Sequence, residues 1–131
     1  MKYIPTIFFV LFLGCIDDDL NENQIHNNIL GKWQLEATKI SPGGIVDWSY
    51  VTDGEKYEFK IDGTIVLSKW EGCKGPINGT FTLDGDQLFL RFSCNETLYE
   101  PAYLIWFEDD KLILGFVGCI EECSYRFSPI P

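Results

Sequence analysis

Beyond residue 30, apolar and polar positions alternate with a period of two in short stretches separated by turns rich in glycine and aspartate. This alternation predicts β-strands with one buried face, because successive side chains of a strand point to opposite faces of a sheet. Asp62-Gly63 and Asp84-Gly85-Asp86 lie between apolar stretches and favour hairpins, because both residue types tolerate the positive φ of tight primed turns. We predict strands at 32–40, 55–61, 64–70, 77–83, 87–93, 103–107, 111–117 and 124–128.

The links between these strands are too short for parallel crossovers, so the predicted sheet is an antiparallel meander. Such a sheet has two unpaired edges unless its first and last strands meet. A barrel of about eight strands closes around an interior that holds side chains or one small ligand. We therefore predict an all-β, eight-stranded antiparallel up-and-down barrel, and the alternative fold is a β-sandwich.

The first 14 residues have the layout of a secretory signal, with Lys2, an apolar stretch at 4–13 and a small residue before a cysteine. This stretch is too short to span a bilayer, which takes about 20 apolar residues. Phe12-Leu13-Gly14-Cys15 resembles the lipobox of bacterial lipoproteins, in which the cysteine becomes the acylated N-terminus. The resemblance implies a signal peptide at 1–14 and lipidation of Cys15, and an ordinary cleaved signal is the alternative.

An acidic cluster at 17–19 follows Cys15 and is similar to the signal that sends Bacteroidetes lipoproteins to the outer face of the outer membrane. The resemblance implies a lipid-anchored outer-membrane protein displayed at the cell surface, whereas the alternative role of the cluster is to keep a tether solvated. The segment 15–29 is polar, and Ile25 and Ile29 stand about one helical turn apart. We predict a tether ending in a short helical turn beneath a domain at 30–131.

The chain is acidic, with 20 Asp and Glu residues against 10 Lys and Arg residues and a formal net charge of −10. Loss of Lys2 with the signal changes this net charge to −11. A surface of this sign repels phosphate backbones, so nucleic acid is excluded as a partner. His26 is the one histidine and lies in the tether, which excludes a Ser-His or Cys-His nucleophile pair in the domain. We predict that the protein is not an enzyme and has no cofactor.

Apart from Cys15, four cysteines are expected outside the cytoplasm, where disulfides persist. Cys119 and Cys123 flank a short predicted turn, and Cys73 and Cys94 lie at strand ends in neighbouring hairpins. Of the three possible pairings we predict Cys119–Cys123 and Cys73–Cys94. The alternative is a zinc site, although the Cys-x-x-Cys spacing typical of structural zinc is absent. Carboxylates gather in predicted turns without EF-hand spacing, so no metal site is predicted, and calcium at one turn tip is the alternative.

A family resemblance accompanies these patterns. Gly31-Lys32-Trp33 at the start of the first strand is similar to the Gly-x-Trp signature of lipocalins, and Arg126 stands where lipocalins carry a basic residue over that tryptophan. The hairpin at 57–64 is similar to one in the short lipocalin-like lipoproteins of Bacteroidetes. The resemblance implies that Gly31, Trp33 and Arg126 join the first strand to the last, with the guanidinium of Arg126 over the indole of Trp33. The alternative is that the two side chains are unrelated, with Trp33 in the core and Arg126 in solvent.

The segment 41–54 is too long for a tight hairpin and contains Trp48 and Tyr50. Long loops in compact domains are commonly functional. In lipocalins the corresponding loop is a lid, so the resemblance implies that Trp48 and Tyr50 cover a ligand. The alternative is that they pack on the outside of the strands.

The leading function is membrane-anchored binding of a small apolar molecule inside the barrel. Trp48 and Tyr50 would stand at the mouth, and strand residues Phe59, Leu90 and Trp106 would line the interior. The alternative function is a protein interaction module of the cell envelope, such as an inhibitor or a complex subunit, in which bulky residues fill the barrel.

Overall fold

The computed structural model describes residues 22–131, so the expected signal at 1–14, the acylation site Cys15 and the acidic cluster at 17–19 lie outside the described residues. One helix, α1 (Glu22–Ile29), precedes the strands. The strands are β1 (Gly31–Ile40), β2 (Ser49–Tyr50), β3 (Lys56–Phe59), β4 (Thr64–Trp70), β5 (Cys73–Asp84), β6 (Gln87–Cys94), β7 (Thr97–Tyr99), β8 (Ala102–Glu108), β9 (Lys111–Phe116) and β10 (Cys123–Ile130).

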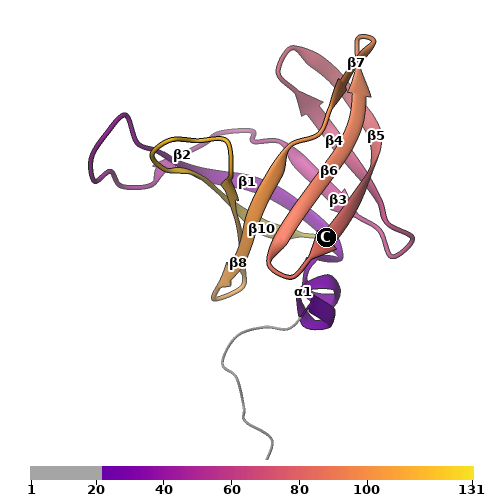
Figure 1. Cartoon of the computed structure of the whole chain (residues 1–131), viewed down its shortest axis with the longest axis horizontal. Coiled ribbons are helices and arrows are strands. Elements are labelled where there is room, and N and C mark those ends of the chain that lie inside the picture. The colour runs from indigo at the N-terminus through magenta and orange to yellow at the C-terminus, as the bar shows by residue number, and fades with distance from the viewer. Residues whose placement is uncertain (1–21) are drawn as a thin grey trace, which may run out of the picture.

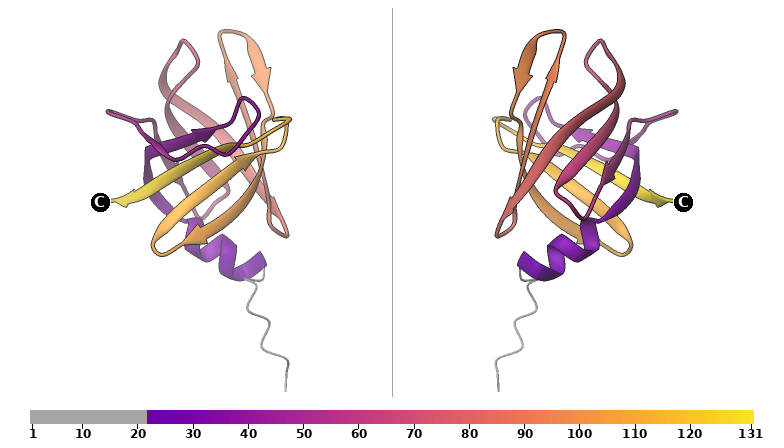
Figure 2. Two further views of the ribbon diagram at one scale, coloured as in Figure 1. Left: turned by 90° about the vertical axis from the view of Figure 1, so that its left-hand side faces the viewer. Right: turned by 90° about the vertical axis from the view of Figure 1, so that its right-hand side faces the viewer.

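Eight of these strands form a closed antiparallel barrel in the order β1, β3, β4, β5, β6, β8, β9 and β10, and β10 pairs back onto β1 (Figures 1 and 2). The closing ladder extends from Lys32 opposite Ile130 to Ile40 opposite Cys123. Two short strands lie outside the ring, where β2 pairs with β1 and β7 pairs with β6. The predicted up-and-down barrel is confirmed and the sandwich is excluded, because the first and last strands are hydrogen-bonded neighbours.

The strand boundaries agree closely with the sequence pattern. β4 covers Thr64–Trp70 as predicted, and β6 begins at Gln87 as predicted. The largest difference is at β5, which begins at Cys73 because its first residues pair with the end of β4, where Trp70 stands opposite Cys73. β2 and β7 were not predicted, and both depend on pairing with strands that continue past the ring.

The inward faces of the strands fill the lower half of the barrel with close-packed apolar side chains. In β6, Leu88, Leu90, Phe92 and Cys94 are buried while the residues between them are exposed, as a period of two requires. Phe59 packs edge-on against Phe81, with ring centroids 5.1 Å apart. Each fully buried side chain of this size contributes about 1.5–3 kcal/mol to folding, so this half is the main source of stability.

The helix α1 closes the lower end of the barrel (Figure 1). Ile25 and Ile29 are buried in the core, and the Trp33 indole Nε1–H donates a 2.7 Å hydrogen bond to the Ile29 carbonyl. An isolated helix of eight residues is not stable in water, so packing against the barrel stabilises α1. Gly31 has a φ of 122°, which lets the chain turn from the helix directly into β1.

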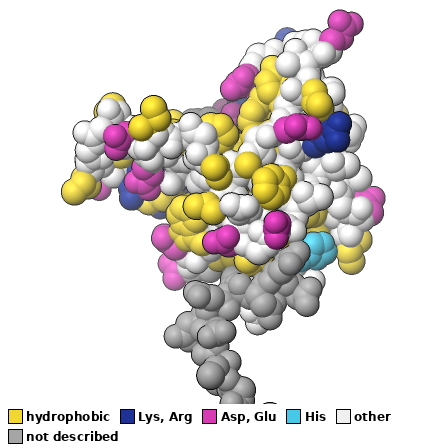
Figure 3. Space-filling view, in the orientation of Figure 1, with side chains coloured by type: hydrophobic (Ala, Val, Ile, Leu, Met, Phe, Trp, Pro, Cys, Tyr) yellow, Lys and Arg dark blue, Asp and Glu magenta, His cyan; other side chains and the backbone are white. Residues whose placement is uncertain are grey.

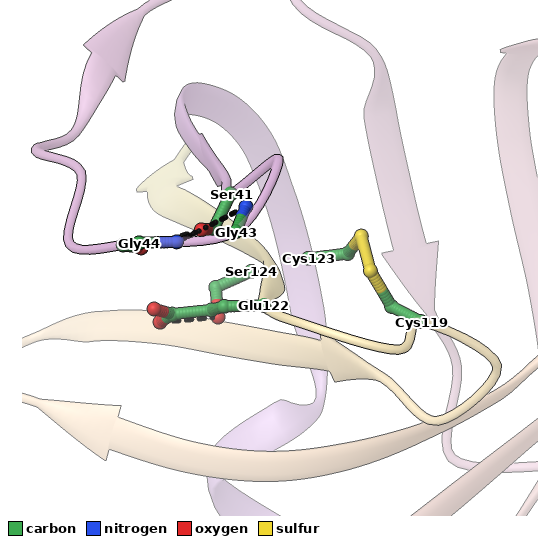
Figure 4. The surroundings of a disulfide bond; sticks show 7 residues. All are labelled: Ser41, Gly43, Gly44, Cys119, Glu122, Cys123 and Ser124. Carbon is green, nitrogen blue, oxygen red and sulfur yellow. Dashed lines mark hydrogen bonds between the residues drawn. A yellow bond between two sulfur atoms is a disulfide. The ribbon is translucent and has the colours of Figure 1, made fainter.

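Both predicted disulfides are present, which excludes the zinc alternative. Cys73–Cys94 joins the start of β5 to the end of β6, where Trp70 packs against Phe92 with ring centroids 5.0 Å apart. This bridge and the aromatic contact hold together the two hairpins that rise above the ring in Figure 2. Cys119–Cys123 closes the connection between β9 and β10 (Figure 4).

The Cys119–Cys123 connection also holds the base of the long loop that follows β1 (Figure 4). The Ser41 backbone N–H donates to the Glu122 carbonyl at 2.9 Å. The Ser41 hydroxyl accepts hydrogen bonds from the backbone N–H groups of Gly43 and Gly44 at 3.2 and 3.0 Å. The loop therefore leaves the barrel in a fixed direction.

Candidate ligand-binding cavity

A cavity of about 210 Å³ lies inside the ring at the end opposite α1. Six of the eight barrel strands contribute to its lining, because inward-pointing residues of β1, β3, β4, β8, β9 and β10 surround it. The lining residues are Leu35, Glu55, Tyr57, Lys69, Trp70, Glu71, Tyr103, Leu114, Tyr125 and Phe127.

The floor and inner wall of the cavity are buried and mainly aromatic. Tyr57 and Phe127 pack with ring centroids 5.0 Å apart, and the rings of Tyr103 and Tyr125 meet edge-on at 6.5 Å. Leu114 is 1% exposed and completes the floor. These side chains cannot move outward, because the strands that carry them are paired on both sides.

The rim of the cavity is polar and open to solvent. Glu71 and Lys69 are exposed, and Glu55 is half-buried. The Lys69 ammonium donates a 3.3 Å hydrogen bond to the Asp53 carbonyl. A molecule entering the cavity therefore passes charged groups before it reaches the aromatic wall.

The environment of the three cavity tyrosines keeps their hydroxyl groups protonated. Burial raises the pKa of Tyr57 and Tyr103, and neighbouring tyrosines and the Glu55 carboxylate raise both further. The Glu71 carboxylate adds to the effect on Tyr103. The pKa of Tyr125 is raised by burial first, and then by the carboxylates of Glu55 and Glu71. The cavity thus presents neutral phenols in a field of negative sign.

The predicted ligand-lining residues Phe59 and Leu90 point into the barrel, as expected from their alternation. Each is 1% exposed, and neither belongs to the cavity lining. They lie in the filled lower half of the barrel. Their contribution is to the core rather than to the cavity surface.

Trp48 and Tyr50 do not stand at the mouth of the cavity, which corrects the expectation of a lid. Tyr50 pairs with Ala37 on the outer side of β1, and Trp48 lies nearby under two cations. The Arg126 guanidinium is 4.7 Å from the Trp48 ring centroid, and the Lys39 ammonium is 5.2 Å from it. The alternative expectation, packing on the outside of the strands, describes them correctly.

The expected packing of Arg126 over Trp33 is also corrected. Trp33 is 6% exposed and points into the barrel, whereas Arg126 lies between the inward residues Tyr125 and Phe127 and therefore points out. The two side chains are on opposite faces of the closing ladder. The ring partners of Arg126 are Trp48 and, at 5.7 Å, Tyr50.

An ion cluster on the outer face reinforces the closure of the barrel. Glu36 occupies an irregularity in the β1 ladder, and its carboxylate is 3.3 Å from the Arg126 guanidinium and 3.1 Å from the Lys111 ammonium. Burial raises the pKa of Glu36, but hydrogen bonds with Lys111 and Ser128 and the two positive charges outweigh it, so the pKa lies below its usual value. One carboxylate thus links β1, β9 and β10.

Trp106 does not line the interior, which corrects a third expectation. Tyr103 and Ile105 are the buried residues of β8, so Trp106 points outward, and the residue is 37% exposed with its ring beside Gly115. It belongs to an apolar patch on the outer surface, and Figure 3 shows apolar side chains gathered on the face crossed by β6 and β8. The patch consists of Leu104, Trp106, Phe116 and Val117, which line one hollow of this surface.

Sequence reasoning missed the residues that form the cavity. Alternation with the buried Phe59 could have placed Tyr57 on the inner face, and the same signal exists for Tyr125 beside Phe127. No signal in the sequence shows which inward residues lie in the filled half and which face open space. Glu55 and Glu71 resemble ordinary turn carboxylates until the fold brings them to one rim.

Comparison with known protein families, with curated proteins and with solved structures finds no match for the chain. The resemblance to lipocalins therefore stays a prediction. Within residues 22–131, no helix is both long and apolar enough to cross a membrane. In the same part of the chain, no three His, Cys, Asp or Glu side chains are grouped to hold a metal ion.

Proposed function

We propose that this protein binds a small molecule with an apolar body and a polar group in the upper cavity of its barrel. The single observation that carries the proposal is a space of about 210 Å³ inside the ring, open to solvent at a charged rim and walled by largely buried aromatic side chains. A cavity of about 150 Å³ lined by apolar side chains holds benzene, whereas typical drug-sized sites measure about 300–1,000 Å³. The ligand is therefore a little larger than benzene.

We further propose that the barrel is a lipoprotein held at the outer membrane by lipid on Cys15. The lipobox resemblance and the acidic cluster at 17–19 support this placement. The described chain begins in α1, at the end of the barrel opposite the cavity (Figure 2). A tether attached there leaves the cavity mouth facing away from the membrane, where small molecules arrive from the medium.

Ligand binding is tested on the full chain, purified with its disulfides formed in a sugar-headed detergent. The protein is titrated by calorimetry with a panel of small probes that includes phenol, indole, 2-phenylethanol and 2-phenylethylamine. We expect at least one probe to bind at a single site. Absence of binding by every probe, whatever its charge, would refute the proposed function.

A matched pair of variants locates the site. Leu114→Phe enlarges a side chain in the cavity floor, and Leu88→Phe enlarges an equally buried leucine outside the cavity lining. Both changes overpack the barrel and cost about 1–3 kcal/mol of stability. Only Leu114→Phe should abolish binding. Equal binding by the two variants would place the ligand elsewhere.

A second candidate function, docking of a protein partner in the envelope, is supported by the outer apolar patch. Val117 is 53% exposed and lines the same surface hollow as Trp106. Contiguous exposed apolar surface of this kind commonly marks an interaction site. A photo-crosslinking amino acid at Trp106 in the full chain, compared with one at Glu58, tests it. Partner capture at both positions alike would contradict docking through this patch.

A further inference from the structure

The cavity has aromatic walls on several sides. Tyr57, Tyr103 and Tyr125 come from β3, β8 and β10, and Trp70 adds an indole from the end of β4. The tyrosines are spread around the ring, so a molecule at the centre meets aromatic rings contributed by three separate strands. Aromatic faces carry partial negative charge, which attracts a cation placed within about 6 Å of a ring centre.

The charged groups at the rim also favour a positively charged ligand. Glu55 and Glu71 both line the cavity, and their negative charge reaches the buried tyrosines, because it contributes to the raised pKa of Tyr103. Within residues 22–131, Lys69 is the one basic side chain in the cavity lining. The Lys69 ammonium is also occupied by the Asp53 carbonyl. The net field at the mouth therefore favours a positive ligand.

From these two features we propose that the ligand is a small organic cation, an alkylammonium or quaternary ammonium group held among the tyrosines and Trp70 with Glu55 and Glu71 at the mouth. This inference rests on the proposed function and names the chemical class of its ligand. The cation brings its own charge into a space that the protein has lined with neutral phenols and aromatic rings. Its apolar substituents contact Leu35, Leu114 and Phe127 on the floor.

Other ligand classes fit the site less well. An anion entering the mouth would be repelled by both glutamates. A metal ion needs several oxygen, nitrogen or sulfur ligands at short distance, and residues 22–131 provide no such group of three. A neutral molecule of the same shape gains the floor contacts but no attraction from the rim. The charge of the ligand is therefore the property that the experiment must vary alone.

Choline and 3,3-dimethylbutan-1-ol are the probes, because they have the same shape and differ in one positive charge. Calorimetric titration of the full chain should show choline binding about tenfold more tightly, since a desolvated cation–π contact of about 1–2 kcal/mol corresponds to that ratio. Added salt should weaken binding of choline and leave binding of the alcohol unchanged. Equal or tighter binding of the alcohol would overturn the inference.

Charge variants at the rim give changes in both directions. Glu55→Gln and Glu71→Gln should each weaken choline binding about threefold, whereas Glu58→Gln on the outer face of β3 should change it less than twofold. Lys69→Gln should tighten choline binding about twofold to threefold. A misfolded variant cannot bind more tightly, so this gain distinguishes electrostatics from damage. Weaker binding in Lys69→Gln would contradict the inference.

The failure of this inference is distinguishable from the failure of the proposed function. If the alcohol or another neutral probe binds while choline does not, the cavity binds ligands and the proposed class of ligand is wrong. If choline binds more tightly than the alcohol and Leu114→Phe abolishes its binding, both stand. If no probe of either charge binds, both are refuted.

Discussion

Substitution of Trp33 by phenylalanine tests how α1 is attached to the barrel. Trp33 is 6% exposed, and its indole Nε1–H is 2.7 Å from the Ile29 carbonyl at the end of the helix. Phenylalanine keeps an aromatic ring in the core but has no donor. The Ile29 carbonyl then loses its partner in a site from which water is excluded.

The cost has two parts. A buried acceptor without a partner costs about 1–3 kcal/mol, and the smaller ring leaves a space that adds about 1 kcal/mol. Together these amount to about 2–4 kcal/mol, which is a large fraction of the about 5–15 kcal/mol that stabilises a typical domain. We expect the melting temperature of Trp33→Phe to fall by about 10 °C or more.

Urea denaturation of the full chain, followed by circular dichroism, measures the loss, and hydrogen exchange reports on α1. The matched control is Trp106→Phe, because Trp106 is 37% exposed and its indole bonds to Glu108 at the surface. We expect the control to change stability by less than about 0.5 kcal/mol. The amides of α1 should lose protection in Trp33→Phe alone.

Two results would refute this reasoning. If Trp33→Phe is as stable as Trp106→Phe, the buried hydrogen bond does not contribute to folding. If stability falls while α1 keeps its protection, Trp33 acts through core packing alone. The second result would separate the helix attachment from the volume of the ring.

Three further predictions concern stability. Replacing both cysteines of the Cys73–Cys94 bridge by serine should lower the free energy of unfolding by about 3 kcal/mol in urea denaturation, and the same change at Cys119–Cys123 by about 2 kcal/mol, because the sequence separations are 21 and 4. Equal losses would contradict the loop-closure argument. The pKa of Glu36 is lower in the folded state, so its stabilisation is present above about pH 4.5 and is lost as the pH falls through the folded pKa. Glu36→Gln should flatten the dependence of the unfolding free energy on pH below about pH 4.5, and an unchanged slope would exclude stabilisation by the ion cluster. The pKa of Tyr57 is higher in the folded state, so its contribution to stability is fully present below about pH 10 and is lost as the pH rises further. Absorbance titration should show fewer tyrosines ionising near pH 10 in the folded protein than in urea, and ionisation of every tyrosine near that pH would contradict burial of the phenols.

The strands of the ring were predictable because their signal is local. Alternation in 87–93 and the Asp62-Gly63 turn depend on a few neighbouring residues, and the structure places β6 and the β3–β4 hairpin there. β7 escaped prediction because its turn has an unusual composition. Asn95 and Glu96 both have positive φ, 50° and 67°, and glutamate rarely accepts that conformation.

The candidate site was predictable only in part. Alternation indicates which face of the sheet a side chain lies on, but not how far along the barrel axis it lies. Phe59 and Leu90 were correctly placed on the inner face, but the cavity lies above them. Trp106 was assigned to the inner face, although the buried Tyr103 and Ile105 leave it on the outer one. Arg126 was paired with the wrong tryptophan, because the loop that brings Trp48 to it has no regular pattern.

The sequence by itself determined the number of ring strands, their order and both disulfides, since these follow from turn chemistry, short links and the positions of four cysteines. Only the tertiary structure decided which end of the barrel is filled and which is open. A cavity is the space that side chains from six strands leave between them, so its size depends on residues far apart in the sequence and no local pattern predicts it. Helix α1 and the large rings of Trp33, Phe59 and Phe81 fill the lower end. Three tyrosines and two glutamates surround the space that remains.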